Sequence, residues 1–133
     1  MAAMFGLTLI VLLALFRARF ISVQSGAVRR IYFLTYSTRD TEPEAAIKLS
    51  RHFSNIFEAP TLFYIVSLLV MIAEITDFVF FSLAWLYVAL RALHAFIHTG
   101  ANQLRSRIAV YFIGWLVLAA MWAYLLFRAT TNI

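Results

Sequence analysis

The 133-residue chain contains no cysteine. It therefore has no disulfide framework, no thiolate metal site and no cysteine nucleophile, and any thiol chemistry needs a sulfur atom that a ligand brings. Glycine occurs four times in the whole chain, which argues against a glycine-rich loop that cradles phosphates. Charged residues make up 13% of the chain, well below their share in ordinary soluble domains. These shortages argue against most classes of soluble enzyme.

Hydrophobic residues make up 64% of the chain, and most of them lie in four apolar segments. A helix needs roughly 20 residues to span the hydrocarbon core of a bilayer, and 108–127 is such a run without a charge. The uncharged runs 1–16, 59–73 and 78–90 are shorter, so each must include flanking polar residues to cross. The first run lacks the basic start and small-residue cleavage site of a signal peptide, which indicates a retained anchor.

We therefore predict an all-α integral membrane protein, a single domain built as an up-and-down bundle of four transmembrane helices. The helices are expected at about 2–22, 50–74, 78–99 and 105–128, with a cytoplasmic loop at about 23–48. The end of this loop, TEPE at 41–44, has the threonine, proline and glutamate typical of a helix start.

The net charge of +5 is explained by membrane topology. Two connections hold most of the basic residues, and the connection near residue 75 holds none; the basic residues are Arg17, Arg19, Arg29, Arg30, Arg39, Lys48, Arg51, Arg105 and Arg107. By the positive-inside rule both basic connections are cytoplasmic and both termini lie on the other side of the membrane. If the protein is bacterial, this membrane is expected to be the inner membrane. Glu74 and Asp77 then lie in a short outer hairpin, and Arg128 departs from the pattern. Nucleic acid is not an expected partner, because the cations do not follow one soluble face.

Polar residues follow one face of two of the predicted helices where these approach the cytoplasm. Arg51, Asn55 and Glu58 fall within an arc of about 60° on the second helix. The third helix and its continuation carry a similar face, made of Arg91, His94, His98, Asn102 and Arg105. Charges inside a bilayer face one another or a wet cavity, so we expect these side chains to converge. A surplus of guanidinium groups over one carboxylate favours an anionic ligand, and carboxylates in particular.

The same residues allow other interpretations. Glu58 could pair with an arginine simply to hold the bundle together, while Arg17, Arg19 and Arg107 extend to the lipid headgroups. His94 and His98 could share a metal ion with Glu58 or His52. The neighbouring arginines would repel such an ion, so we predict no metal site.

Two segments resemble a known family. RHFSNIFEAP, from Arg51 to Pro60, resembles the second-helix signature of the MAPEG superfamily, the membrane-associated proteins of eicosanoid and glutathione metabolism. LRALHAFIHTGANQLRSR at 90–107 resembles the segment in which the third helix ends and the fourth begins. The resemblance covers nearly the whole chain, and points to a bacterial-type member.

The resemblance implies a homotrimer that binds glutathione as a co-substrate between neighbouring subunits, on the cytoplasmic side and open to membrane lipid. Arg51 and Arg91 would then hold the glutathione carboxylates, Asn55 would bind its backbone, and Glu58 would receive its ammonium group. Arg105 matches the arginine that stabilises the thiolate in enzymatic members, since a nearby guanidinium lowers the pKa of a thiol. Hydrophobic small molecules would reach the site through the bilayer.

The chain also departs from the family pattern. His94 and His98 stand where transferases of the family carry tyrosines, and Ala59 replaces an aromatic residue. Two functions therefore remain open: a glutathione transferase or peroxidase acting on hydrophobic substrates, and a non-catalytic trimer that binds a lipid or fatty acid. A small multidrug exporter is a weaker third reading, because the first helix has no acid and Glu58 is accompanied by arginines.

Overall fold

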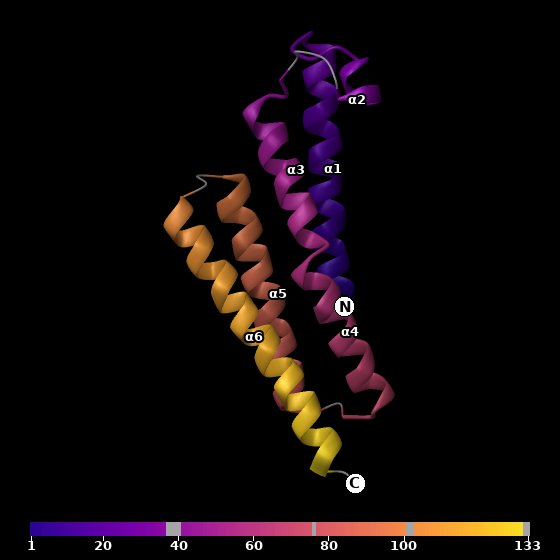
Figure 1. Ribbon diagram of the computed structural model, residues 1–133, viewed down its shortest axis with the longest axis vertical. Coiled ribbons are helices and arrows are strands. Elements are labelled where there is room, and N and C mark those ends of the chain that lie inside the picture. The colour runs from indigo at the N-terminus through magenta and orange to yellow at the C-terminus, as the bar shows by residue number, and fades with distance from the viewer. Residues whose placement is uncertain (37–40, 76, 101–102, 132–133) are drawn as a thin grey trace.

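The structure is a computed structural model that describes residues 1–36, 41–75, 77–100 and 103–131 (Figure 1). Arg39 and Asn102, named above, lie outside the described residues. Within the described part the chain is all-helical, and four of its helical spans are long and apolar enough to cross a membrane. The helices are α1 (Ala2–Gln24), α2 (Tyr32–Thr35), α3 (Glu44–Ile56), α4 (Ala59–Ile72), α5 (Phe78–Thr99) and α6 (Leu104–Thr131).

Consecutive membrane spans run in opposite directions, and α3 and α4 together form the second span (Figure 1). The turn from α1 into α3 and the turn from α5 into α6 lie toward the same end of the bundle, and this end carries most of the lysine and arginine residues. We call it the basic end. The turn from α4 into α5 and the C-terminus lie at the other end, whereas the N-terminus lies beside the junction of α3 and α4 (Figure 1).

The second membrane span is interrupted, a feature that the predicted single helix at about 50–74 did not include. α3 ends at Ile56, Phe57 and Glu58 form a turn, and α4 begins at Ala59. Pro60 has no backbone N–H and cannot continue a hydrogen-bond ladder from the preceding turn, which explains the break. The Thr61 hydroxyl donates to the Phe57 carbonyl at 2.8 Å, so one carbonyl at the break keeps a partner.

The span also starts earlier than its apolar composition indicates. α3 begins at Glu44, directly after Pro43, where the TEPE sequence has its helix-starting residues. Its first two turns mix charged or polar residues with alanine, isoleucine and leucine, so hydropathy locates only the later part of this span. The Lys48 ammonium pairs with the Glu44 carboxylate at 2.7 Å on one face of this first part.

The bundle core is apolar and combines residues from α1, α4, α5 and α6. Phe63 of α4 stacks on Tyr87 of α5 with ring centroids 4.8 Å apart. The other buried members are Met4, Ala59, Val66, Val70, Ile75, Phe80, Val117, Leu118, Met121 and Leu125. Many large apolar side chains are exposed instead, as expected of helices whose outer faces meet lipid.

Arg19 and Glu42 join the end of α1 to the segment that leads into α3. The Arg19 Nη2 atom donates to Glu42 Oε1 at 3.3 Å and to the Ser50 hydroxyl at 3.4 Å. The Glu42 carboxylate is buried, so this pair fixes the connection instead of extending to headgroups. Arg17, in contrast, is exposed, so the two arginines of the first helix have different surroundings.

Asp77 and Arg128 form an ion pair at the end of the bundle opposite the basic end. Asp77 caps the N-terminus of α5 by accepting a hydrogen bond from the Phe80 N–H at 3.0 Å, and it also accepts one from the Tyr124 hydroxyl. These hydrogen bonds and the Arg128 charge hold the pKa of Asp77 below its ordinary value. Arg128, the arginine that departs from the distribution of basic residues in the sequence, therefore has an acidic partner. The pair ties the start of α5 to the end of α6.

We expect Asp77→Asn to lower the midpoint of thermal unfolding at neutral pH, because the variant keeps a capping side chain but loses the negative charge. A carboxyl group whose pKa is lowered by folding stabilises the protein above its unfolded-state pKa, and this stabilisation is lost as the pH falls through the folded-state pKa. The difference in midpoint between wild type and variant should therefore shrink below about pH 4. Glu74→Gln, at an exposed carboxylate of the same hairpin, is the matched control and should change little. A difference that stays constant down to about pH 2 would contradict this account.

Candidate functional site

A cleft of about 430 Å³ opens between α3, α5 and α6 in the half of the bundle nearer the basic end. Its lining combines two guanidinium groups, two imidazoles and other hydrogen-bonding groups with an apolar side formed by Ile108 and Phe112 of α6. The remaining lining residues are Arg51, Ser54, Asn55, His94, His98, Arg107 and Tyr111. Among the described residues no aspartate or glutamate lines it, so the cleft favours an anion.

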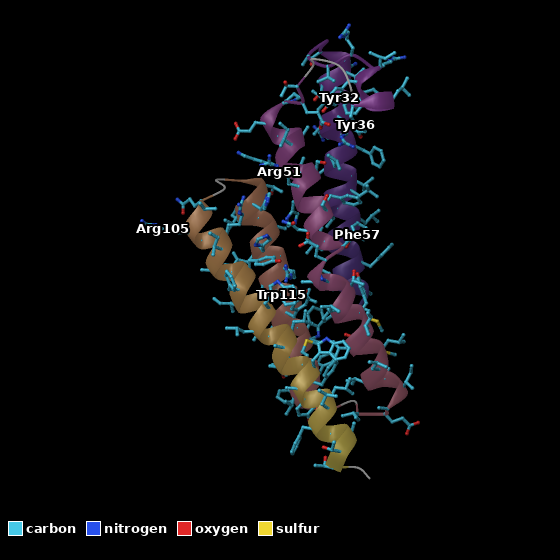
Figure 2. All side chains as sticks on the ribbon, viewed as in Figure 1. Tyr32, Tyr36, Arg51, Phe57, Arg105 and Trp115 are labelled. Carbon is cyan, nitrogen blue, oxygen red and sulfur yellow. The ribbon has the colours of Figure 1, made fainter. Side chains whose placement is uncertain are left out.

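Arg51 of α3 and Arg107 of α6 supply the guanidinium groups of the cleft. Arg51 is exposed and Arg107 is half-buried. Figure 2 shows Arg51 on α3 and Arg105 at the start of α6. Arg105 is exposed and is not part of the lining of the cleft. Two positions along a helix correspond to about 200° of rotation, so Arg105 and Arg107 cannot face the same wall.

All three histidines of the chain meet where α3 packs on α5, and we call His52, His94 and His98 the histidine cluster. The ring centroid of His52 lies 5.5 Å from that of His94 and 5.1 Å from that of His98. The rings of His94 and His98 are 5.7 Å apart. His94 and His98 line the cleft, whereas His52 lies behind them and is 2% exposed.

Arg91 lies deeper in the bundle than the cleft and is 5% exposed. Its guanidinium carbon is 5.0 Å from the Tyr87 ring centroid and 5.4 Å from that of Tyr111, so two aromatic faces stabilise the charge. Gly114 of α6 leaves room for it, because a β-carbon at this position would lie 3.5 Å from Arg91 Nη2. The Nε and Nη2 atoms of Arg91 have no hydrogen-bond partner among the described residues.

A small inner cavity of about 10 Å³ separates Arg91 from the histidine cluster. It has room for about one water molecule. Asn55, His52 and His94 line it from one side and Arg91 from another, and the lining is completed by Met4, Leu7, Ile56 and Pro60. Asn55 and His94 also line the cleft, so the two cavities share a wall.

The structure brings together four of the seven site residues predicted from the sequence: Arg51, Asn55, His94 and His98. Arg91 is next to them but faces the inner cavity. Glu58 is exposed in the turn between α3 and α4 and forms no ion pair with a described residue. Arg105 and Glu58 therefore lie outside the cleft.

Three residues near the cleft are not among the site residues predicted from the sequence: Arg107, Tyr111 and His52. One alternative interpretation of the sequence places Arg107 at the lipid headgroups, whereas in the structure it lines the cleft. Arg107 and Tyr111 are four residues apart, and so are Ile108 and Phe112, which all line the cleft. This spacing places them on one face of α6 and is the signal that could have identified them. His52 follows Arg51 directly, and nothing in the helix periodicity marks it.

A second cavity, of about 460 Å³, lies on the other side of the bundle core, between the start of α1, α4 and α5. Its lining is apolar apart from Ser67, and includes Phe63, Val70, Phe81 and Trp85. Such a lining suits a hydrocarbon chain or ring and offers nothing to an anion. No group of three or more histidine, aspartate or glutamate residues in the described part of the chain has the geometry of a metal site.

Comparison with known proteins identifies a family. The model of the MAPEG family matches residues 1–127 of the chain. No curated protein and no solved structure gives a significant match.

Proposed function

Since the chain belongs to the MAPEG family, we propose that it binds glutathione, or a ligand of similar anionic chemistry, in the cleft at the basic end. The observation that carries this proposal is the cleft itself, where Arg51 and Arg107 supply positive charge and two imidazoles supply hydrogen bonds. Guanidinium groups bind carboxylates through charge-assisted, often bidentate hydrogen bonds, and glutathione has two carboxylates. By the positive-inside rule this end is the cytoplasmic one. The C-terminus then lies on the opposite side, and α1 runs toward the cytoplasm from an N-terminus beside the junction of α3 and α4, so the N-terminus also faces away from the cytoplasm (Figure 1).

The ligand site is shared between subunits of a homotrimer. Glu58 supports this part of the proposal, because an exposed carboxylate near the middle of the span Glu44–Ile72 would be costly against hydrocarbon. A neighbouring copy that covers Glu58 removes the cost and adds an acceptor for the ammonium group of glutathione. Arg105, exposed at the start of α6, would then reach a ligand held by the neighbouring copy.

The reaction that fits this arrangement is attack of the glutathione thiolate on a hydrophobic electrophile or peroxide. On binding, the thiol releases its proton to solvent, and the thiolate sulfur forms a bond to the electrophilic carbon while the bond from that carbon to the leaving group breaks. With a peroxide, the sulfur instead forms a bond to one oxygen while the O–O bond breaks, and the departing alkoxide takes a proton from solvent. A second glutathione then attacks the resulting sulfenic acid, which gives glutathione disulfide and water. Arg105 stabilises the thiolate. The apolar substrate enters past Ile108 and Phe112, the apolar side of the cleft.

Arg105→Ala tests the catalytic role. If Arg105 lowers the thiol pKa by one or two units, the variant should lose about tenfold to a hundredfold in the rate of glutathione conjugation. The substrate for this assay is 1-chloro-2,4-dinitrobenzene, and native mass spectrometry checks that the oligomer is intact.

Arg107→Ala is the matched comparison, because it should raise the glutathione concentration needed for half-maximal rate more than it lowers the rate. An Arg105→Ala protein with wild-type turnover would reject this assignment, while the anion-binding proposal would remain.

A non-catalytic lipid-binding role is the second candidate, and the apolar cavity lined by Phe63 and Trp85 favours it. In this role the arginines of the cleft bind the carboxylate or phosphate of one lipid, and an acyl chain of another lipid fills the apolar cavity, which shares no lining residue with the cleft. Mass spectrometry of the purified protein separates the two functions. A retained lipid together with no thermal shift on adding glutathione would favour lipid binding.

A further inference from the structure

The histidine cluster has buried ring nitrogens without hydrogen-bond partners in the described part of the chain, and those of His52 do not face the cleft. Both ring nitrogens of His52, both of His94 and Nδ1 of His98 are buried without a hydrogen-bond partner among the described residues. Buried polar atoms of this kind are normally satisfied by protein or by ordered water. The inner cavity beside His52 and His94 is large enough for about one such water, which would connect the imidazoles to one another.

Among the described residues, the charged side chains around the cluster are cations. The cations that act electrostatically on it are Lys48 and Arg51 of α3, Arg91 of α5 and Arg107 of α6. The other titratable groups that face it are the phenols of Tyr111, whose ring lies 5.7 Å from that of His94, and of Tyr87 beyond Arg91. α1 contributes the uncharged Met4 and Leu7, and α4 contributes Pro60. No carboxylate in the described part of the chain lines either cavity.

An anion in the cleft supplies the negative charge that this surrounding lacks. It would lie against His94 and His98, which form part of the cleft wall. Imidazole is the side chain that changes charge near neutral pH. Two binding events that favour each other do so reciprocally, so an anion that favours a proton on the cluster is itself bound more tightly when that proton is present.

We propose that the histidine cluster takes up one proton from solvent when an anionic ligand enters the cleft, and that His52 is a positioning residue that shares this proton. His52 does not line the cleft and acts through His94 and His98, whose rings it contacts from behind. The inference rests on the proposed function, because it needs an anionic ligand in this cleft. The proton returns to solvent when the ligand leaves.

The experiment is calorimetric titration of the full-length protein in lipid nanodiscs, in two buffers of different ionisation enthalpy. The form of glutathione used in all of these titrations is S-methylglutathione, which keeps both carboxylates but has no thiol proton to release on binding. Uptake of a proton makes the observed enthalpy differ between the buffers. It also tightens binding as the pH falls, by up to about tenfold per pH unit for one proton, and we expect about threefold to tenfold between about pH 7.5 and pH 6.5.

His52→Phe and His52→Gln isolate the role of His52. Both remove its ability to titrate; phenylalanine keeps a ring and glutamine keeps hydrogen-bonding atoms, so at least one should preserve the packing, as judged by thermal unfolding. We expect glutathione to bind either variant with a pH dependence below about twofold per unit. Comparison with wild type cancels any titration of glutathione itself.

The outcomes separate the two proposals. Binding of glutathione with the same affinity and enthalpy at every pH and in both buffers would overturn the proton uptake while leaving the anion site intact. An unchanged pH dependence in both His52 variants would overturn the role of His52. Absence of glutathione binding at any pH would instead reject the proposed function, and the inference with it.

Discussion

Replacing Arg51 with alanine is expected to weaken the binding of glutathione by about tenfold to a hundredfold. Arg51 lines the cleft and is exposed to it, and a hydrogen bond to a charged group contributes about 1.5–3 kcal/mol, which corresponds to this range of dissociation constants. The loss should appear in the dissociation constant measured by calorimetric titration. Because the guanidinium is exposed, the free energy of unfolding should change little.

Arg17→Ala is the control for this variant. Arg17 is an exposed arginine on α1 that lines neither the cleft nor the inner cavity. Its removal lowers the net charge by the same amount as the removal of Arg51 but leaves the lining of the cleft unchanged. If both variants lost the same affinity, the effect would be one of overall charge, and the cleft would not be the binding site. Equal affinity of Arg51→Ala and wild type would remove Arg51 from the site altogether.

Gly114→Leu should destabilise the bundle by about 1–3 kcal/mol, the range for overpacking a well-packed interior. A β-carbon at position 114 would touch Arg91 at ordinary contact distance, so any larger side chain must displace the guanidinium from between Tyr87 and Tyr111. Arg91 would then keep a buried charge with less stabilisation from the aromatic rings. The free energy of unfolding in detergent, measured by denaturant titration, checks the expectation.

Gly114→Ala provides the matched comparison, since its methyl group fits at 3.5 Å from Arg91 Nη2 and should cost much less. A leucine variant as stable as the alanine variant would show that α6 does not pack against the guanidinium as described. The pair of variants therefore tests the placement of Arg91 without changing Arg91 itself.

The fold class was predictable from composition and charge distribution alone. Four long apolar helices and membership of the MAPEG family are both confirmed, because hydrophobic length and a family signature are local properties of the sequence. The break at Phe57 and Glu58 was missed, although Pro60 was part of the motif that identified the family. A proline near the middle of a long apolar span is tolerated in membranes, so its presence did not by itself predict two separate helices.

For the candidate site, the sequence predicted the residues that share one face of a single helix, but not how the helices are rotated against one another. Arg51 and Asn55 share a helix face, as do His94 and His98, and both pairs line the cleft. Glu58 falls on the same face by spacing, but the interruption after Ile56 changes the course of the chain before it. The choice between Arg105 and Arg107 depends on the rotation of α6 about its axis, which packing against α5 sets and the sequence does not state.

The interrupted second span separates two mechanical tasks. α3 forms one wall of the cleft with Arg51, Ser54 and Asn55, while α4 packs Phe63 and Val66 into the core. Because the backbone ladder stops between them, a tilt of α3 that widens the cleft need not be transmitted to α4 as bending. The contacts of Phe63 and Val66 with the core can therefore stay in place while the cleft widens.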